Sequence, residues 1–234
     1  MESRHGKGYF DEGDQRRSLN INTGLAGVFG LMFLGLLASA TSALFTATSP
    51  FMRDLVLFSN AFYVFLFAPF LLVLFAFPRV WGMSTGGAIL LFVFYALLNG
   101  VTLSVIFIVF DLGTIVLAFA AAAGMFGVMA IYGALTKADL SGVGSFLLMG
   151  LFGFIIASVL NWFIVSDTMD MLITYGGIAI FLGLTAYDVQ RLKRAMNEHA
   201  GNAPTGVIVM GALHLYLDFI NILLLLLRLF ARRR

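Results

Sequence analysis

Seven long apolar segments dominate this chain of 234 residues, and each is about 19–24 residues long, near the ~20 that a helix needs to cross the hydrocarbon core of a bilayer. Only 11% of the residues are charged, against about 25% in an ordinary soluble domain, so the solvent of this protein is lipid. The segments are predicted at residues 24–47, 55–77, 87–110, 113–135, 143–165, 171–189 and 207–230.

The apolar runs are continuous rather than alternating with period two, which excludes a membrane β-barrel. Lipid offers the backbone no hydrogen-bond partner, so each run is predicted to be a helix. We therefore predict an all-α polytopic membrane protein, with one domain of seven transmembrane helices at residues 22–234. Residues 1–21 have mixed charges and no apolar core, so they are expected to be a disordered cytoplasmic tail rather than a signal peptide.

The distribution of Lys and Arg predicts a cytoplasmic N-terminus. Nine basic residues then lie inside and only Arg53 lies in an outer loop, which is a strong positive-inside bias. The C-terminal arginines, Arg228 and 232–234, oppose this bias, so the last segment is expected either to tolerate them outside or to be re-entrant. The outer segments carry acidic residues that attract cations or are merely solvated. These are Asp54, Asp111, Asp167 and Asp170.

Two acidic residues lie within the predicted spans, Asp188 in the sixth and Asp218 in the seventh. A carboxylate at the centre of a bilayer costs roughly 2.5–3.5 kcal/mol on insertion scales, so Asp218 indicates a function. The two spans are antiparallel neighbours, which allows the carboxyl groups to face each other. His214, Asn221 and Arg228 share the helix face of Asp218, and this polar stripe predicts a central last helix. Asp188 has a plainer interpretation as an interfacial residue near Arg191.

Two buried carboxylates within reach of each other form a coupled pair. At ~4 Å and an effective dielectric constant near 20, their repulsion is roughly 4 kcal/mol, which places the second ionisation of the pair near neutral pH. Such a pair shares a proton at lower pH and repels once both carboxyl groups are ionised, so it can act as a pH-dependent gate. Once ionised, it also offers hard oxygen ligands that bind Ca²⁺ weakly. Weak binding suits a site through which the ion passes better than a site that retains it. No other metal site and no cofactor are expected.

The segments GMFGVMAIYGALTKADLSG, GLTAYDVQRLK and GALHLYLDFINILLLLLRLF resemble the signature segments of the Bax inhibitor (TMBIM-type) family, in its bacterial branch. The resemblance implies two three-helix layers around a central C-terminal helix. It also implies a pH-sensitive calcium leak in a bacterial inner membrane, gated by Asp188 and Asp218. Relatives are implied to act in stress or cell-death protection, and some to bind a membrane-anchored protease.

This chain departs from the family pattern at Val189, where threonine is common, and in two further places. The second predicted span contains no basic residue, and Arg53 only precedes it, so a closed state held by an arginine of that helix is in doubt. His214 stands where a small or hydroxyl residue is usual. Because the ordinary pKa of histidine is near 6.5, His214 is a candidate modulator of the pH response, with Asn221 and Arg53 as weaker candidates.

Other functions fit the residues less well. Tyr187-Asp188 resembles one half of an intramembrane aspartyl protease site, but Asp218 lacks the surrounding glycines and the chain has too few spans. Retinal binding needs a lysine in the last span, which has none. Dispersed basic residues exclude a nucleic-acid partner. We therefore expect a non-enzymatic protein, either a calcium leak channel or a membrane scaffold that regulates a partner, with a proton-coupled transporter as a third option.

Overall fold

The structure is a computed structural model that describes residues 6–57, 59, 61–199 and 203–232, and for residues 6–20, 57 and 62 only the backbone. Arg4, Arg233 and Arg234 of the charge prediction lie outside it. All described elements are helical, and seven helices are long and apolar enough to span a membrane, as predicted. The α-helices of the described residues, which include the short α2 and α5, are α1 Gly6–Thr48, α2 Pro50–Leu57, α3 Ala61–Leu71, α4 Thr85–Leu103, α5 Ile106–Val109, α6 Leu112–Leu135, α7 Ser141–Ile164, α8 Asp167–Glu198 and α9 Thr205–Ala231.

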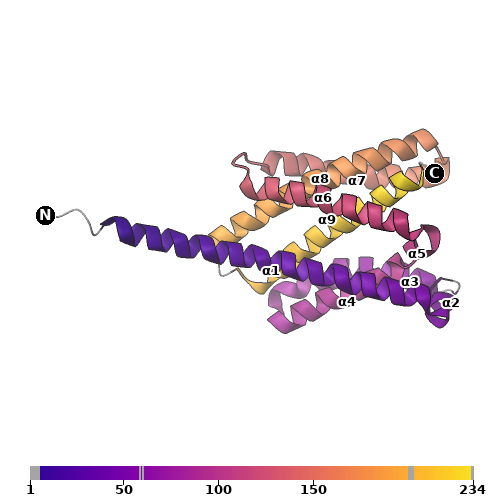
Figure 1. The fold of residues 1–234 in the computed structure, drawn as a ribbon, viewed down its shortest axis with the longest axis horizontal. Coiled ribbons are helices and arrows are strands. Elements are labelled where there is room, and N and C mark those ends of the chain that lie inside the picture. Colours follow the sequence, from indigo (N-terminus) through magenta and orange to yellow (C-terminus); the bar gives the residue numbers. More distant parts are fainter. Residues whose placement is uncertain (1–5, 58, 60, 200–202, 233–234) are drawn as a thin grey trace.

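The helices form two layers around α9, as Figure 1 shows. One layer consists of α1, α3 and α4, and the other of α6, α7 and α8. Helix α9 packs against both layers and has the most buried span in the described part of the chain. The resemblance to the Bax inhibitor family implied this arrangement, and the structure confirms it. We call the end of the bundle from which α1 protrudes the N-terminal end, and the end where α9 finishes the C-terminal end.

A buried polar network holds α9 to the first layer. The Ser39 hydroxyl donates to the carbonyl of Ala96 at 2.8 Å and lies 2.7 Å from the Tyr216 hydroxyl. The Asn99 side-chain amide donates to the same tyrosine oxygen at 2.8 Å. Tyr95 packs edge-on against the Tyr216 ring. The tyrosine of the LYLDF segment therefore fixes α9 against α1 and α4, two residues before Asp218 in the sequence.

Several predicted boundaries were wrong, and each has a local cause. The second span begins at Tyr63 rather than Leu55, because residues 50–57 form the separate helix α2, which buries Val56 and exposes Phe51. That span contains Pro69 and continues as a π-helical turn, Leu72–Ala76, and a 3₁₀ helix, Phe77–Gly82. Proline removes a backbone donor, so such departures from α-helix are expected beside it.

Two segments expected outside the helices are helical. Helix α8 runs to Glu198, nine residues beyond its predicted end at Val189, because QRLKRAMNE contains neither glycine nor proline. Helix α1 begins at Gly6, whereas the tail was expected to be disordered. Extending an existing helix costs far less than starting one, and no proline precedes Pro50.

Pairs of small residues four positions apart predict close helix packing, and the sequence has them at Ala120–Gly124, Ala123–Gly127 and Ala179–Gly183. A side chain at Gly183 would meet Leu147 of α7 at 2.6 Å, so this prediction is confirmed there. A side chain at Gly124 or Gly127 would have no neighbour within 4 Å, so the prediction was wrong for these two glycines. The closest approaches of helix backbones occur instead at Gly100, against Ser39, and at Gly133, against Ala186. Spacing alone does not distinguish a face that meets a helix from one that meets lipid.

Candidate functional site

The two intramembrane aspartates come from neighbouring antiparallel helices, α8 and α9. Asp218 is only 5% exposed, whereas Asp188 is half-buried. Their carboxyl groups are close enough to interact electrostatically. Asp188 lies 10 residues before the end of α8, in the half nearer the N-terminal end of the bundle, whereas Asp218 lies at the middle of α9. The structure thus brings together the pair that the sequence indicated.

Asp218 has an incomplete set of hydrogen-bond partners. Its Oδ2 atom is one of two buried side-chain polar atoms without a partner in the described part of the chain. Its hydrogen-bonding neighbour is Thr185. The Thr185 hydroxyl also donates to the Phe181 carbonyl of its own helix at 2.8 Å. An unsatisfied buried polar group costs about 1–3 kcal/mol, which indicates a role other than stability.

A cavity of about 160 Å³ lies beside the pair, toward the N-terminal end, and its walls come from α8, α9 and the 3₁₀ helix at Phe77–Gly82. Asp188 and His214 both line it, together with Arg191 and Trp81. His214 and Arg191 are the basic groups that interact electrostatically with Asp188. The half-buried carboxyl group therefore faces this cavity, whereas Asp218 lies deeper, behind it.

The candidate modulators have different positions. His214 is half-buried and shares the cavity with Asp188, as its spacing from Asp218 indicated. Asn221 donates to the Leu217 carbonyl of its own helix at 2.8 Å and makes no described contact with either aspartate. Arg53 is exposed on α2, at the C-terminal end of the bundle, remote from the pair (Figure 1). The structure therefore brings only His214 to the site.

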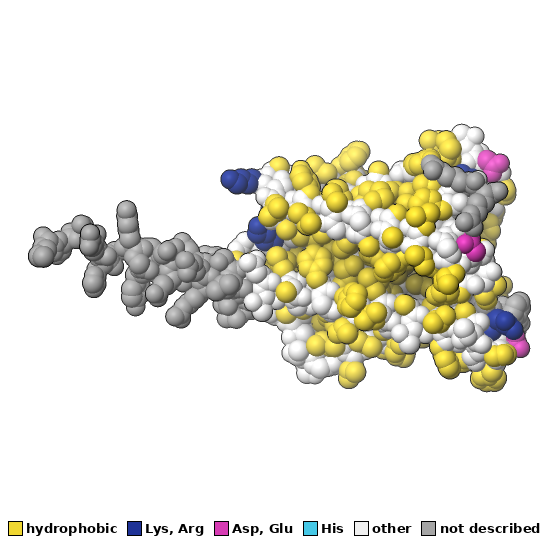
Figure 2. Space-filling model, in the orientation of Figure 1, with side chains coloured by type: hydrophobic (Ala, Val, Ile, Leu, Met, Phe, Trp, Pro, Cys, Tyr) yellow, Lys and Arg dark blue, Asp and Glu magenta, His cyan; other side chains and the backbone are white. Residues whose placement is uncertain are grey.

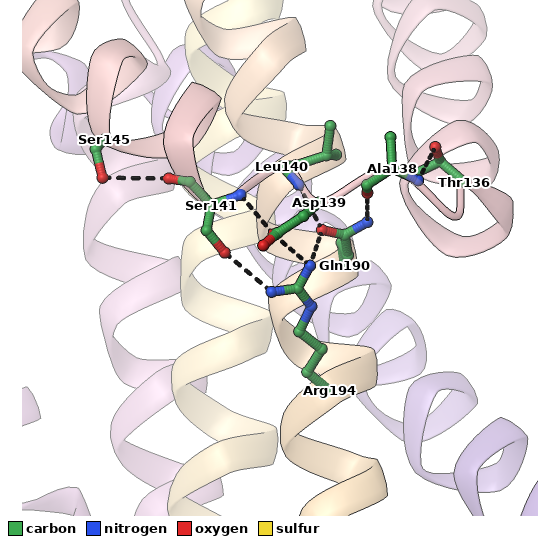
Figure 3. Close-up of polar contacts among 8 residues, drawn as sticks. All are labelled: Thr136, Ala138, Asp139, Leu140, Ser141, Ser145, Gln190 and Arg194. Carbon is green, nitrogen blue, oxygen red and sulfur yellow. Dashed lines mark hydrogen bonds and ion pairs between the residues drawn. The ribbon is translucent and has the colours of Figure 1, made fainter.

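Two residues past Asp188, Gln190 holds α8 to the loop between α6 and α7 (Figure 3). Its side-chain nitrogen donates to the Ala138 carbonyl at 2.7 Å, and its side-chain oxygen accepts from the Leu140 amide at 3.0 Å. Arg194 donates to the same Gln190 oxygen at 2.7 Å and to Asp139 Oδ1 at 2.6 Å. We call Gln190, Arg194 and Asp139 the loop clamp.

The backbone amide of Ser141 and the guanidinium of Arg194 hold the pKa of the Asp139 carboxyl group well below its usual range. Lys193 adds to this attachment by donating to the Ala134 carbonyl near the end of α6, at 2.6 Å. The loop clamp was missed at the sequence level. The available signal was the position of Gln190 in the AYDVQ segment, and Arg194 one turn after it on the same helix face.

At the C-terminal end, Asp170 forms ion pairs with Arg228 and Arg232, the latter at 2.5 Å. Asn161 of α7 lies 3.4 Å from the same carboxylate. We call Asp170, Arg228 and Arg232 the ionic pin. Because Asp170 is 8% exposed, its interpretation as a solvated loop residue was wrong. Helix α9 is continuous, so the re-entrant alternative is not observed, and acidic partners on α8 offset the charges of Arg228 and Arg232, two of the arginines that opposed the charge bias.

The site offers few ligands to a bound metal ion. No group of three or more His, Cys, Asp or Glu side chains with suitable geometry occurs among the described residues. Asp188 and Asp218 thus provide two carboxylates without a third such ligand. Ca²⁺ prefers 6–8 oxygen ligands, so this chemistry suits transient contact with a cation rather than a structural calcium site.

Comparison with known proteins gives the family. The family model described as "Inhibitor of apoptosis-promoting Bax1" matches residues 21–234. The chain belongs to the Bax inhibitor family. Among relatives in this family, the inner membrane protein YbhL of Escherichia coli K12 is 41% identical over 219 residues, which cover 92% of this chain and 93% of YbhL. A protein of Borreliella burgdorferi is 42% identical over 217 residues, covering 91% and 93%. Protein YrjE of Lactococcus lactis is 35% identical over 225 residues, covering 92% and 93%.

Membership of the Bax inhibitor family confirms the resemblance seen in the sequence, and the match extends over all seven spans. These findings establish a multi-pass membrane protein. The roles of Asp188, Asp218 and His214 remain predictions, and they rest on the geometry described above.

Proposed function

We propose that this protein is a pH-sensitive calcium leak channel of a bacterial inner membrane, gated by Asp188 and Asp218. The observation that carries the proposal is the buried Asp218 carboxyl group, which lacks a partner for one oxygen and lies within electrostatic range of Asp188. A carboxyl pair at this depth is costly, and a shared proton relieves the repulsion. We assign the structure to a closed state of this channel, because Asp218 is buried and does not line the cavity beside Asp188.

The two ends of the α8–α9 contact support a specific opening movement. The ionic pin ties the helices together at the C-terminal end. At the N-terminal end their contact is apolar, with Leu192 of α8 packed against Gly211 of α9. The loop clamp there holds α8 to its own layer rather than to α9. Ionisation of both aspartates therefore separates the helices at the N-terminal end, with the ionic pin as the pivot.

Opening at that end exposes Asp218 to the cavity that Asp188 already lines. The permeating ion then meets two carboxylates, which are hard oxygen ligands suited to Ca²⁺. Weak binding by only two ligands allows the ion to leave again. His214 and Arg191 face the same space, and both interact electrostatically with Asp188.

The location follows from three observations. YbhL is named an inner membrane protein, seven helices can span a bilayer, and Lys and Arg favour a cytoplasmic N-terminus. The cavity beside Asp188 then opens toward the cytoplasm, so cytoplasmic pH controls the gate. We also propose a non-enzymatic role, in keeping with membership of the Bax inhibitor family.

The experiment that tests the proposal is Ca²⁺ flux into liposomes carrying the purified protein at pH 6, 7 and 8. Flux through the wild type should rise with pH, because repulsion grows as the pair loses its shared proton. Asp218→Asn and Asp188→Asn should lose this dependence while remaining folded. Asp54→Asn is the matched control, since it makes the same change at an exposed carboxylate of α2 and should behave as wild type.

Two outcomes would overturn the proposal. Flux equal to that of empty liposomes at every pH would favour a scaffold that regulates a partner such as a membrane-anchored protease. Flux that keeps its pH dependence in both folded variants would show that the aspartates do not gate it. His214→Ala, measured in parallel, should shift the pH midpoint of the flux without abolishing the pH response.

A further inference from the structure

A second cavity, of about 300 Å³, lies between the two helix layers in the C-terminal half of the bundle. Helices α1, α5 and α6 form its walls, and α9 forms its floor through Phe219, Ile220 and Leu223. Helices α1 and α6 each pack against α9 but hardly against each other in the described structure, which leaves this groove between them. Figure 2 views this face and shows hydrophobic side chains across the strip between α1 and α6.

The groove is lined almost entirely by apolar atoms. Ser39 is its only lining residue with a polar side chain, and the hydroxyl of Ser39 is already engaged by Ala96 and Tyr216. A buried water molecule needs two to four polar partners, so water is disfavoured here. A hydrated or partly hydrated cation is disfavoured for the same reason. This groove is therefore not part of an ion path.

The mouth of the groove faces the region that lipid chains occupy. Val116 and Phe119, on the wall formed by α6, are 59% and 47% exposed. On the opposite wall Ala40 of α1 is also exposed. All three lie within spans long enough to cross the bilayer, in the halves nearer the C-terminal end. At this depth the surrounding solvent consists of acyl chains. The cavity volume of about 300 Å³ gives room for a segment of one such chain.

We propose that this groove binds one acyl chain of a phospholipid from the leaflet at the C-terminal end. The chain lies between α1 and α6 and contacts Phe219 and Ile220, the two residues that follow Asp218. It fills the space that the two layers leave uncovered and supports the middle of α9 from the side opposite the Asp188 cavity. This binding does not depend on the proposed leak, and its test measures lipid rather than flux.

The test uses a matched pair of substitutions on α6. Ala120 lines the groove, whereas Ala123 is exposed on the same helix and does not line it. Wild-type protein is reconstituted with phosphatidylethanolamine and phosphatidylglycerol, extracted in mild detergent, and examined by native mass spectrometry. A retained phospholipid is expected on the wild type and on Ala123→Phe. Ala120→Phe should lower the lipid-bound fraction about tenfold, as expected when roughly two methylene contacts are lost.

Other outcomes would overturn the inference. Equal retention by both folded variants would show that the lipid binds elsewhere. Retention of added oleic acid but of no phospholipid would identify a free fatty acid as the occupant. A protein dimer that Ala120→Phe dissociates would identify a second copy of the chain. If Ala120→Phe does not fold, Ala40→Phe fills the groove from the α1 wall and should lower lipid retention in the same way.

Discussion

The two ends of the α8–α9 contact differ in chemistry. At the C-terminal end, Asp170 bridges two arginines of the α9 region, whereas at the N-terminal end Leu192 packs on Gly211 beside a cavity that contains Asp188. Among the described residues, ion pairs between these helices occur only at the C-terminal end. Charge therefore joins the helices at one end, and charge on the aspartate pair would separate them at the other. The same residue type has opposite effects because Asp170 forms ion pairs with Arg228 and Arg232 across the contact, whereas the neighbour of Asp218 across the contact is a second carboxyl group, that of Asp188.

The largest effect is expected from removing one charge of the pair. Asp218→Asn should raise the unfolding temperature at pH 8 above that of wild type, because it removes a repulsion of up to about 4 kcal/mol. The difference should shrink toward pH 6, where the pair shares a proton. Thermal unfolding in detergent at both pH values measures this. A variant less stable than wild type at pH 8 would show that the pair is not repulsive there.

Breaking the ionic pin should act in the opposite direction. Asp170→Asn leaves two arginines without their carboxylate and should lower the free energy of unfolding by about 2 kcal/mol, less than for a fully buried pair because Arg228 is 45% exposed. Calcium flux at pH 6 should also rise, since the pivot is lost. Asp167→Asn is the control, with a fully exposed carboxylate 3.7 Å from Arg232 and an expected change near zero. Equal effects of the two variants would contradict the pivot.

Removing Gln190 separates α8 from the loop between α6 and α7 without touching α9. Gln190→Ala leaves the Leu140 amide and the Ala138 carbonyl without their partner and should cost about 1 kcal/mol. The pH midpoint of flux should shift, since Asp188 lies on the same helix two residues away. Denaturation in detergent and liposome flux give the two readouts. An unchanged midpoint in a destabilised variant would make the loop clamp purely structural.

The smallest effect concerns the pH dependence contributed by Asp139. Its pKa is lower in the folded protein than the ordinary value near 3.9, so its stabilising contribution is fully present above that value. The contribution is lost only as pH falls through the lowered folded pKa. Asp139→Asn should therefore reduce stability by the same amount at pH 5, 6, 7 and 8. A penalty that varies across this range would assign part of the pH response to the loop clamp.

The polar residues of α9 show how far sequence reasoning reached. Spacing placed His214 and Asp218 on one face, and the structure finds His214 in the cavity of Asp188 and Asp218 behind it. The same spacing included Asn221, which instead bonds to its own helix at Leu217. Asp170 was read as a loop residue because it lies beside a predicted span end. Its burial depends on two arginines about 60 residues away, which no local pattern reveals.

The sequence by itself determined the solvent, the seven spans and the family. In lipid, a continuous apolar run can satisfy its backbone hydrogen bonds only as a helix. The family is recognisable because its signature segments are long and occur in a fixed order along the chain. It also identified the costly pair, since a charge in an apolar run stands out. The tertiary structure decided what each polar residue meets. The ionic pin, the loop clamp and the groove between α1 and α6 all arise from residues distant in the chain. Their contacts depend on how helices rotate and pack, and hydropathy does not encode that rotation.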